Sequence, residues 1–121
     1  IKMRQENAQF LSSHLSSIEE LEVPKPPSNY EHIFQMYTVR LKNNTIRNSL
    51  HDYLTKKKIF SKVYFSPIHL TDFYKSKYGY DKNSLPLTEK ISQEVLTLPL
   101  YPNMTNEEKT YLVESIKEFF E

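Results

Sequence analysis

The sequence predicts an α/β sandwich, in which a small and mainly antiparallel sheet is packed with helices. Three observations lead to this fold class. The 121 residues are enough for a single modest core. Two segments show the period-two alternation of strands, and five others repeat apolar residues at helical spacing. Capping and turn residues separate these segments, so we expect one α/β (α+β) domain.

The first segment has the spacing of a helix that is already under way at residue 1. Ala8, Leu11, Leu15 and Ile18 share one face, and no residue that could cap the helix precedes them. From this beginning we expect a fragment of a longer protein, while processing or removal of a tag would give the same beginning. We expect a single C-terminal domain with three parts: the end of a long helix (1–22), a proline-rich connector (23–30) and an α/β body (31–121).

Two segments predict strands in this body. Residues 32–41 place Tyr37 and Val39 on one face, together with the polar Gln35. This segment is apolar on both faces near its start, so we expect both faces to be covered there. The second strand is expected over residues 59–65, where aromatic residues and valine are concentrated.

Four later segments predict helices, and each has a start or stop signal. Asn44 or Thr45 is expected to cap the first, and Gly79 to end the second in a left-handed conformation. Thr105 and Glu108 predict a capping box before the last. The expected helices cover approximately residues 45–58, 70–78, 87–98 and 105–120.

Composition excludes several classes of protein. The hydrophobic content is 38% and the mean hydropathy is −0.63, which predicts a soluble domain without a membrane span. There is no cysteine, which excludes disulfides and thiolate metal ligands and fits a cytoplasmic location. The net charge of +1 gives no one-sided basic field for nucleic acid. The four histidines lack the spacing of zinc ligands, so we expect no metal.

The order of the motifs resembles the C-terminal small domain of DegT-type nucleotide-sugar aminotransferases, which are fold-type I enzymes that use pyridoxal phosphate (PLP). The resemblance covers almost the whole chain. The family's first strand resembles His32-Ile33-Phe34-Gln35-Met36-Tyr37-Thr38-Val39-Arg40, and its Pro-Leu-His turn resembles Pro67-Ile68-His69. Its proline-rich stretch is similar to Leu98-Pro99-Leu100-Tyr101-Pro102. The start of its last helix is similar to Thr105 with Glu108.

Two departures from the family pattern affect the expectations. The family usually has Gly-Ile after the lysine-rich helix end, where the chain turns through a left-handed residue. Here Lys58 precedes Ile59, and a non-glycine residue in that conformation costs roughly 1 kcal/mol. Tyr64 replaces a frequent histidine and Phe65 a tyrosine, so the sugar specificity of relatives does not transfer directly.

The resemblance implies an enzyme when the chain is part of a full-length protein. Relatives hold PLP on a lysine of a large domain, take an amino group from glutamate and pass it to a nucleotide-linked keto sugar for polysaccharide or glycan biosynthesis. They are homodimers. We therefore expect a nucleotide-sugar aminotransferase whose large PLP-binding domain is absent here. We assign no catalytic or cofactor-binding residue to this chain and expect it to be inactive alone.

Three residues are candidates for binding the substrate. Tyr64 could contact a sugar or nucleotide through its ring and hydroxyl, although a buried strand tyrosine would have the same sequence pattern. Gln35 could line the site, or lie at an edge or beside water, because an amide on an apolar face needs partners. His69 could bond the substrate, or cap the next helix or fill a surface groove.

Two other functions remain open. One is a PLP- or pyridoxamine phosphate (PMP)-dependent sugar dehydratase of the same family, in which histidine replaces the anchoring lysine. The other is a stand-alone α/β binding or oligomerisation module without enzymatic activity. A small domain without its large domain should expose the apolar patch that normally meets it, whereas a true module should bury its apolar faces.

Overall fold

A computed structural model describes the whole chain, residues 1–121. It has five α-helices, one short 3₁₀ helix and three strands. In chain order these elements are α1 (Lys2–Leu15), β1 (Leu21–Glu22), β2 (Tyr37–Leu41), α2 (Asn44–Lys56), η1 (Ile68–Leu70), α3 (Asp72–Tyr78), α4 (Pro86–Glu94), β3 (Val95–Leu98) and α5 (Asn106–Phe120).

The sheet is antiparallel and has the order β1-β2-β3. Val39 pairs with Leu96 and Tyr37 with Leu98, so the buried residues of the two longer strands lie opposite one another. Period-two alternation puts these side chains on one face, while Thr38, Arg40 and Thr97 point to the other face and are only partly buried. One face of the sheet therefore carries the core.

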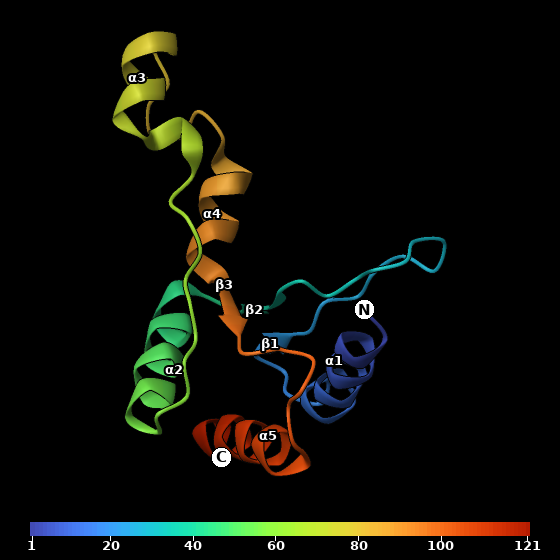
Figure 1. The fold of residues 1–121 in the computed structure, drawn as a ribbon. Helices are drawn as coiled ribbons and strands as arrows, with labels where there is room; N and C mark the ends of the chain where they lie inside the picture. Colours follow the sequence, from blue (N-terminus) through green and yellow to red (C-terminus); the bar gives the residue numbers. More distant parts are fainter.

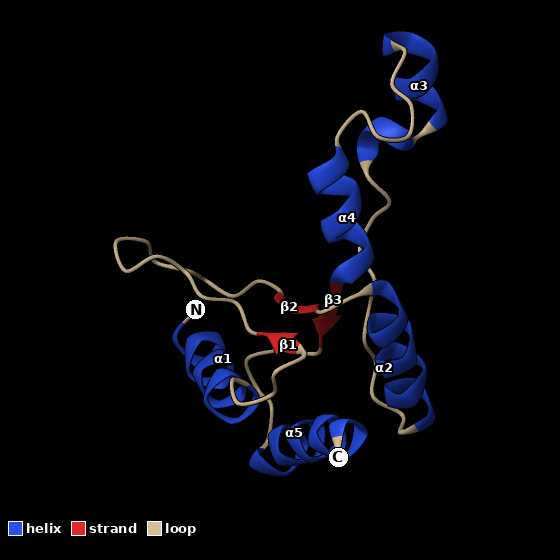
Figure 2. Cartoon of the chain, turned by 180° about the vertical axis from the view of Figure 1, so that it is seen from behind, coloured by secondary structure: helices blue, strands red, loops and turns tan.

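Helices α1, α2 and α5 cover this face, as Figures 1 and 2 show. Their apolar stripes meet the sheet through Leu11, Leu50 and Ile116, each of which is fully buried. The small antiparallel sheet with helices packed on it confirms the predicted α/β class. None of the helices is both long and apolar enough to cross a bilayer.

Two parts of the chain extend away from this core. One is the proline-rich connector and the residues after it, and the other is an arm that we define as residues 66–94, with η1, α3 and α4 (Figure 1). Helix α3 lies at the far end of the arm and has no buried residue. Aromatic side chains on it, among them Phe73 and Tyr78, are 61% and 56% exposed. The arm thus presents a large apolar surface in this chain.

The first helix is shorter than predicted. It ends at Leu15 rather than near residue 22, and the two serines that follow have a low helix propensity. Ile18 still packs against the core, and Leu21 reaches it from strand β1, where it pairs with Leu41. The apolar spacing therefore identified core residues correctly but assigned the last of them to the wrong element.

The first predicted strand begins five residues late, at Tyr37 instead of His32. Phe34 has a φ of +46°, a left-handed conformation that interrupts an extended strand. The expectation that both faces are covered near residue 33 was wrong, since Ile33 and Met36 are both 47% exposed.

The second predicted strand, residues 59–65, is an extended segment with a single bridge, in which Lys62 and Thr97 exchange two backbone hydrogen bonds of 2.9 and 2.8 Å. The backbone N–H donors that would extend this ladder on either side of the bridge are missing or already bonded. Pro99 has no N–H to donate. The N–H of Val95 donates to the carbonyl of Ile91 at the end of α4.

The helix predicted over residues 87–98 ends at Glu94, and its last four residues form β3. Pairing with β2 overrides the helical spacing there, because Leu96 and Leu98 are buried in the alternating pattern of a strand. The cap of α2 is Asn43, one residue before the predicted pair, and its Oδ1 accepts from Ile46 N at 2.9 Å. The capping box at Thr105 is confirmed, with hydrogen bonds of 2.8 and 3.2 Å to Glu108.

The left-handed turn predicted at Gly79 is present, and the family's left-handed turn also forms at Lys58. Gly79 ends α3 with a φ of +70°. Lys58 follows α2 with a φ of +62°, although it carries a side chain. Its N–H donates to Thr55 O at 3.0 Å, and the N–H of Ile59 donates to Leu54 O at 2.9 Å. These are the two bonds of a Schellman motif, so the turn expected from the family pattern forms here without glycine.

Candidate functional site

The segment from Ile59 to Pro67, which is extended as far as Tyr64 and turns at Phe65 with a φ of +36°, separates two hollows in the surface. Alternate side chains of an extended chain point to opposite sides. Accordingly, Lys62 and Tyr64 line one hollow, and Val63 and Phe65 line the other. The single bridge to Thr97 fixes this segment beside the sheet and so sets which side chains enter which hollow.

The first hollow contains two of the three predicted substrate-binding residues, Gln35 and Tyr64. We name it the Tyr64 hollow. Its volume is about 240 Å³, and six of its ten lining residues are hydrophobic. The lining residues are Gln35, Met36, Phe60, Lys62, Tyr64, Thr97, Leu98, Pro99, Leu100 and Tyr101. Residues far apart in sequence thus meet at the edge of β3, although Gln35 lies outside the strand expected to carry it.

Lys62 is the residue of this hollow that the sequence reasoning missed. Its Nζ lies 5.3 Å from the centre of the Phe60 ring and 5.6 Å from that of Tyr64, which is the geometry of cation–π contacts. The alternation of the segment already placed Lys62 on the same side as Tyr64, so the signal was present. The hollow thus combines a cation, an amide and a phenol on an apolar floor.

A loop from Leu98 to Pro102 forms the opposite wall. Asn7 on α1 is buried, and its Nδ2 donates to the carbonyls of Tyr101 at 2.9 Å and Pro102 at 3.3 Å. The Glu108 carboxylate, as a hydrogen-bonding neighbour, raises the pKa of the Tyr101 hydroxyl, with a smaller contribution from burial. The wall therefore presents a neutral phenol, held in place by the first helix.

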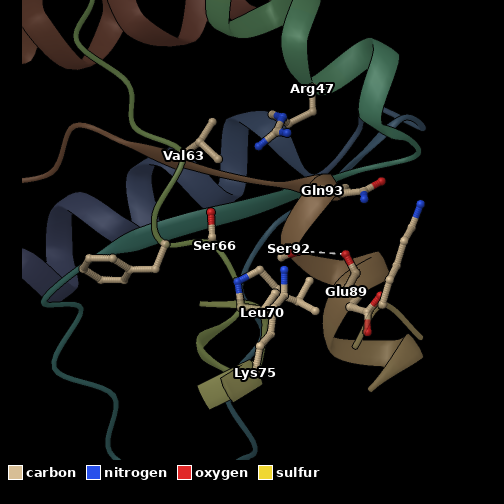
Figure 3. Close-up of a pocket in the computed structure, with 11 residues that line it drawn as sticks. Arg47, Val63, Ser66, Leu70, Lys75, Glu89, Ser92 and Gln93 are labelled. Carbon is tan, nitrogen blue, oxygen red and sulfur yellow. Dashed lines mark hydrogen bonds between the residues drawn. The ribbon is translucent and has the colours of Figure 1, made fainter. Parts of the chain in front are cut away.

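The second hollow, which we name the Arg47 cavity, lies on the other side of the segment (Figure 3). Its volume is about 390 Å³, and it is formed between α2 of the core and the arm. Three cationic residues and one carboxylate are among its lining. The lining residues are Arg47, Val63, Phe65, Ser66, Pro67, Leu70, Lys75, Lys82, Glu89, Ser92 and Gln93.

Arg47 is the deepest charged group of this cavity, with 7% of its surface exposed. Its Nε donates to Asn48 Oδ1 at 2.8 Å, and its Nη1 donates to Val95 O at 3.4 Å. None of the ion pairs in the structure involves it. Burial lowers the pKa of the Arg47 guanidinium below its usual value. Arg47 is not among the site residues that the sequence analysis selected.

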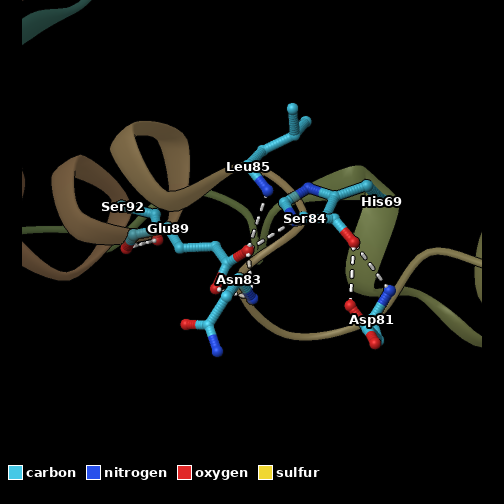
Figure 4. Close-up of polar contacts among 7 residues, drawn as sticks. All are labelled: His69, Asp81, Asn83, Ser84, Leu85, Glu89 and Ser92. Carbon is cyan, nitrogen blue, oxygen red and sulfur yellow. Dashed lines mark hydrogen bonds and ion pairs between the residues drawn. The ribbon is translucent and has the colours of Figure 1, made fainter.

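His69, the third predicted residue, lies apart from Gln35 and Tyr64. It is buried in η1, and its Nε2 lies 3.0 Å from Glu89 Oε1 (Figure 4). Because an ionised carboxylate only accepts hydrogen bonds, the Nε2–H of His69 is the donor. The backbone N–H groups of Asn83 and Leu85 donate to the same carboxylate at 2.9–3.2 Å. His69 and Glu89 thus fasten η1 and the loop after α3 to the start of α4.

The hydrogen bond from His69 and the one from the Asn83 amide lower the pKa of Glu89, in that order of importance. Burial opposes this shift but does not reverse it. The carboxylate is therefore held in its charged form, in which it accepts all of these bonds. The role that the structure shows for His69 is to position the arm.

The lysines of this chain differ in their setting from a lysine that forms a Schiff base with PLP. Every lysine is exposed or only partly buried, so none has the enclosed setting that activates a lysine amine for Schiff-base chemistry. The hydrogen bond to Glu118 raises the pKa of Lys57, which is the opposite of what such chemistry requires.

Comparison with known proteins gives one family and one fold. The sequence model of the DegT/DnrJ/EryC1/StrS aminotransferase family matches residues 1–117. GDP-perosamine synthase of Escherichia coli O157:H7 is 27% identical over 120 residues, which are 99% of this chain and 31% of that protein.

Two solved structures with similar folds are DesV of S. venezuelae, in complex with a ketimine intermediate, and ntda from Bacillus subtilis with the bound cofactor PMP. DesV has a TM-score of 0.89 and 23% identity over 99% of this chain, and ntda has 0.82 and 22% over 98%. The chain spans 32% of DesV and 28% of ntda. These likenesses confirm the predicted fold, and the chain corresponds to less than a third of each relative.

Proposed function

This chain belongs to the DegT/DnrJ/EryC1/StrS aminotransferase family, and on that premise we propose that it is the C-terminal small domain of a PLP-dependent nucleotide-sugar aminotransferase. The observation that carries the proposal is a family match that extends over residues 1–117. The proposed reaction moves an amino group from glutamate to a nucleotide-linked keto sugar for glycan biosynthesis. A cytoplasmic homodimer is part of the same proposal.

In this proposal the cofactor is held by a large domain outside these 121 residues. PLP supplies the electron sink that makes amino transfer possible, and protein groups supply orientation. The family membership and the PMP in the ntda structure support this cofactor. The absence of an enclosed lysine in this chain is consistent with a cofactor held elsewhere.

The contribution of this chain is to bind and orient the sugar nucleotide at the Tyr64 hollow. The ring of Tyr64 offers an apolar surface and its hydroxyl a hydrogen-bonding group, a combination suited to sugars and bases. Gln35 adds an amide and Lys62 a positive charge on the same hollow. Such a set can fix the orientation of a ligand with both polar and apolar faces.

His69 remains a predicted substrate-binding residue with a more indirect role. Its Nε2 is already bonded to Glu89, and only 6% of its surface is exposed. We propose that it acts by holding the arm in place beside the site, and that Tyr64 and Gln35 make the direct contacts. This division of roles predicts that changes at His69 affect arm stability first.

The test is to follow the amino group itself. The complete gene product, supplied with PLP, nitrogen-labelled glutamate and a nucleotide-linked keto sugar, should yield a labelled amino sugar by mass spectrometry. Loss of oxygen from the sugar without uptake of label would instead indicate the dehydratase. A gene product that binds no PLP and changes neither substrate would leave the non-enzymatic module as the better account.

A further inference from the structure

The Arg47 cavity contains a buried positive charge that has no anionic partner in the chain. A guanidinium has five N–H donors. Asn48 and Val95 accept from two of those of Arg47, which leaves three without a protein acceptor. Burying a charge is costly unless it is paired. A buried arginine with free donors on a cavity of about 390 Å³ therefore indicates a missing anion.

Two lysines on the arm increase the positive charge of the same cavity. Lys75 on α3 and Lys82 in the loop after it both line the cavity, and neither takes part in an ion pair. They come from a different part of the fold than Arg47, which lies on α2 of the core. The cavity therefore has positive groups on both its core side and its arm side (Figure 3).

The single carboxylate in the cavity, that of Glu89, offsets only one of the three cations. Both oxygens of Glu89 already accept hydrogen bonds, from His69 and from the amides of Asn83 and Leu85. The Ser66 hydroxyl and the side-chain amide of Gln93 provide neutral donors that bond to nothing else in the structure. The lining is thus rich in donors and carries an excess of positive charge.

We propose that the Arg47 cavity is a binding site for a phosphate or diphosphate group. The planar fork of a guanidinium matches two phosphate oxygens, and lysines act on phosphates as point charges. Cations on two sides suit an anion with several charged oxygens. The cavity volume falls within the roughly 300–1,000 Å³ typical of ligand pockets.

Under the proposed function, the bound group is the diphosphate of a nucleotide sugar. Only this choice of source rests on the proposed function. The extended segment that lines the Arg47 cavity also lines the Tyr64 hollow. One ligand could therefore place its diphosphate on one side of this segment and its sugar on the other. Free phosphate or pyrophosphate is the alternative source of the same chemistry.

Calorimetric titration of the complete gene product with inorganic pyrophosphate tests the site directly. We expect saturable binding that weakens as salt is added, and none for an uncharged nucleoside. The Lys75→Met/Lys82→Met variant should lose about tenfold in affinity, and Arg47→Met roughly 10- to 100-fold. A Lys25→Met/Lys42→Met variant removes the same charge from exposed positions outside the cavity and should bind as the unchanged protein does.

The paired lysine variant keeps the test valid even if loss of buried Arg47 prevents folding, since Lys75 and Lys82 are exposed. Equal pyrophosphate affinity in this variant and the unchanged protein would overturn the proposal, as would no binding at all. Tighter binding of a nucleoside diphosphate, with the same loss in the variant, would identify the nucleotide as the source. Equal affinity for pyrophosphate and the nucleoside diphosphate would identify free anions.

The two proposals can fail separately. Pyrophosphate binding that depends on Lys75 and Lys82, in a protein that transfers no amino group, would retain the anion site and refute the proposed function. Amino transfer by a protein that binds pyrophosphate equally well with and without these lysines would retain the proposed function and refute the anion site.

Discussion

Replacing Lys58 with glycine should make this chain more stable, although it removes a charged side chain from a well-formed turn. Lys58 has a φ of +62°, where a Cβ atom is crowded by the backbone. The bonds of the Schellman motif, Lys58 N to Thr55 O and Ile59 N to Leu54 O, hold it in that conformation. Ile59 and Leu54 are both buried, so the turn cannot relax without exposing core.

The expected gain follows from two opposing effects. A side chain in the left-handed region costs about 1–2 kcal/mol, which glycine avoids. Glycine also lowers the free energy of unfolding by about 0.5–1 kcal/mol, because it makes the unfolded chain more flexible. The net stabilisation is about 0.5–1 kcal/mol. For a chain of this length it raises the melting temperature by about 2–4 °C.

Thermal unfolding followed by circular dichroism would measure this shift in the 121-residue chain. Lys58→Ala keeps the Cβ and should not gain, which separates the backbone effect from the loss of the lysine charge. Lys56→Gly changes the last helical residue of α2 and should lower stability by up to about 1 kcal/mol. A melting temperature for Lys58→Gly at or below that of the unchanged chain, or an equal rise in Lys58→Ala, would refute the reasoning.

Three further predictions concern the cap of α5, the arm and the candidate site. Thr105→Ala removes the cap of α5 and should cost about 1 kcal/mol in denaturant unfolding, whereas an unchanged midpoint would contradict the capping geometry. The lowered pKa of Glu89 adds stability that is complete above the ordinary value of 4.5 and is lost as the pH falls below it. Glu89→Gln should therefore show a flatter fall in melting temperature from pH 5 to 3, and an equal fall in both proteins would exclude this role. Under the proposed function, Tyr64→Ala should raise the KM for the sugar nucleotide roughly tenfold and leave the reaction with glutamate unchanged. The exposed Tyr30, changed in the same way, should have no effect.

Local signals in the sequence predicted most of the fold. The capping residues Thr105 and Glu108 and the left-handed Gly79 all function as their chemistry indicates. The errors arose where tertiary pairing overrides local spacing. Val95 and Leu98 continue the helical spacing of Leu87 and Ile91, but pairing with β2 makes them strand residues. No local signal marks Phe34 as the residue that delays the start of β2.

The candidate site was predictable only in part, for a related reason. Sequence reasoning selected Gln35 and Tyr64 separately, and the structure brings them into one hollow. Their meeting depends on the bridge between Lys62 and Thr97, a contact between residues far apart in the sequence. Arg47 lies at helical spacing from Leu50 and Leu54, so its burial was predictable from the sequence, whereas the cavity beside it forms only where α2 meets the start of the arm.

The central claim, that this chain is part of a PLP-dependent aminotransferase, is tested most directly by the visible absorption of the complete gene product. The protein is supplied with PLP, freed of excess cofactor and measured before and after addition of glutamate. The account predicts a band from bound PLP that disappears when glutamate is added. A protein that retains no PLP, or a band that glutamate leaves unchanged, would contradict amino transfer from glutamate.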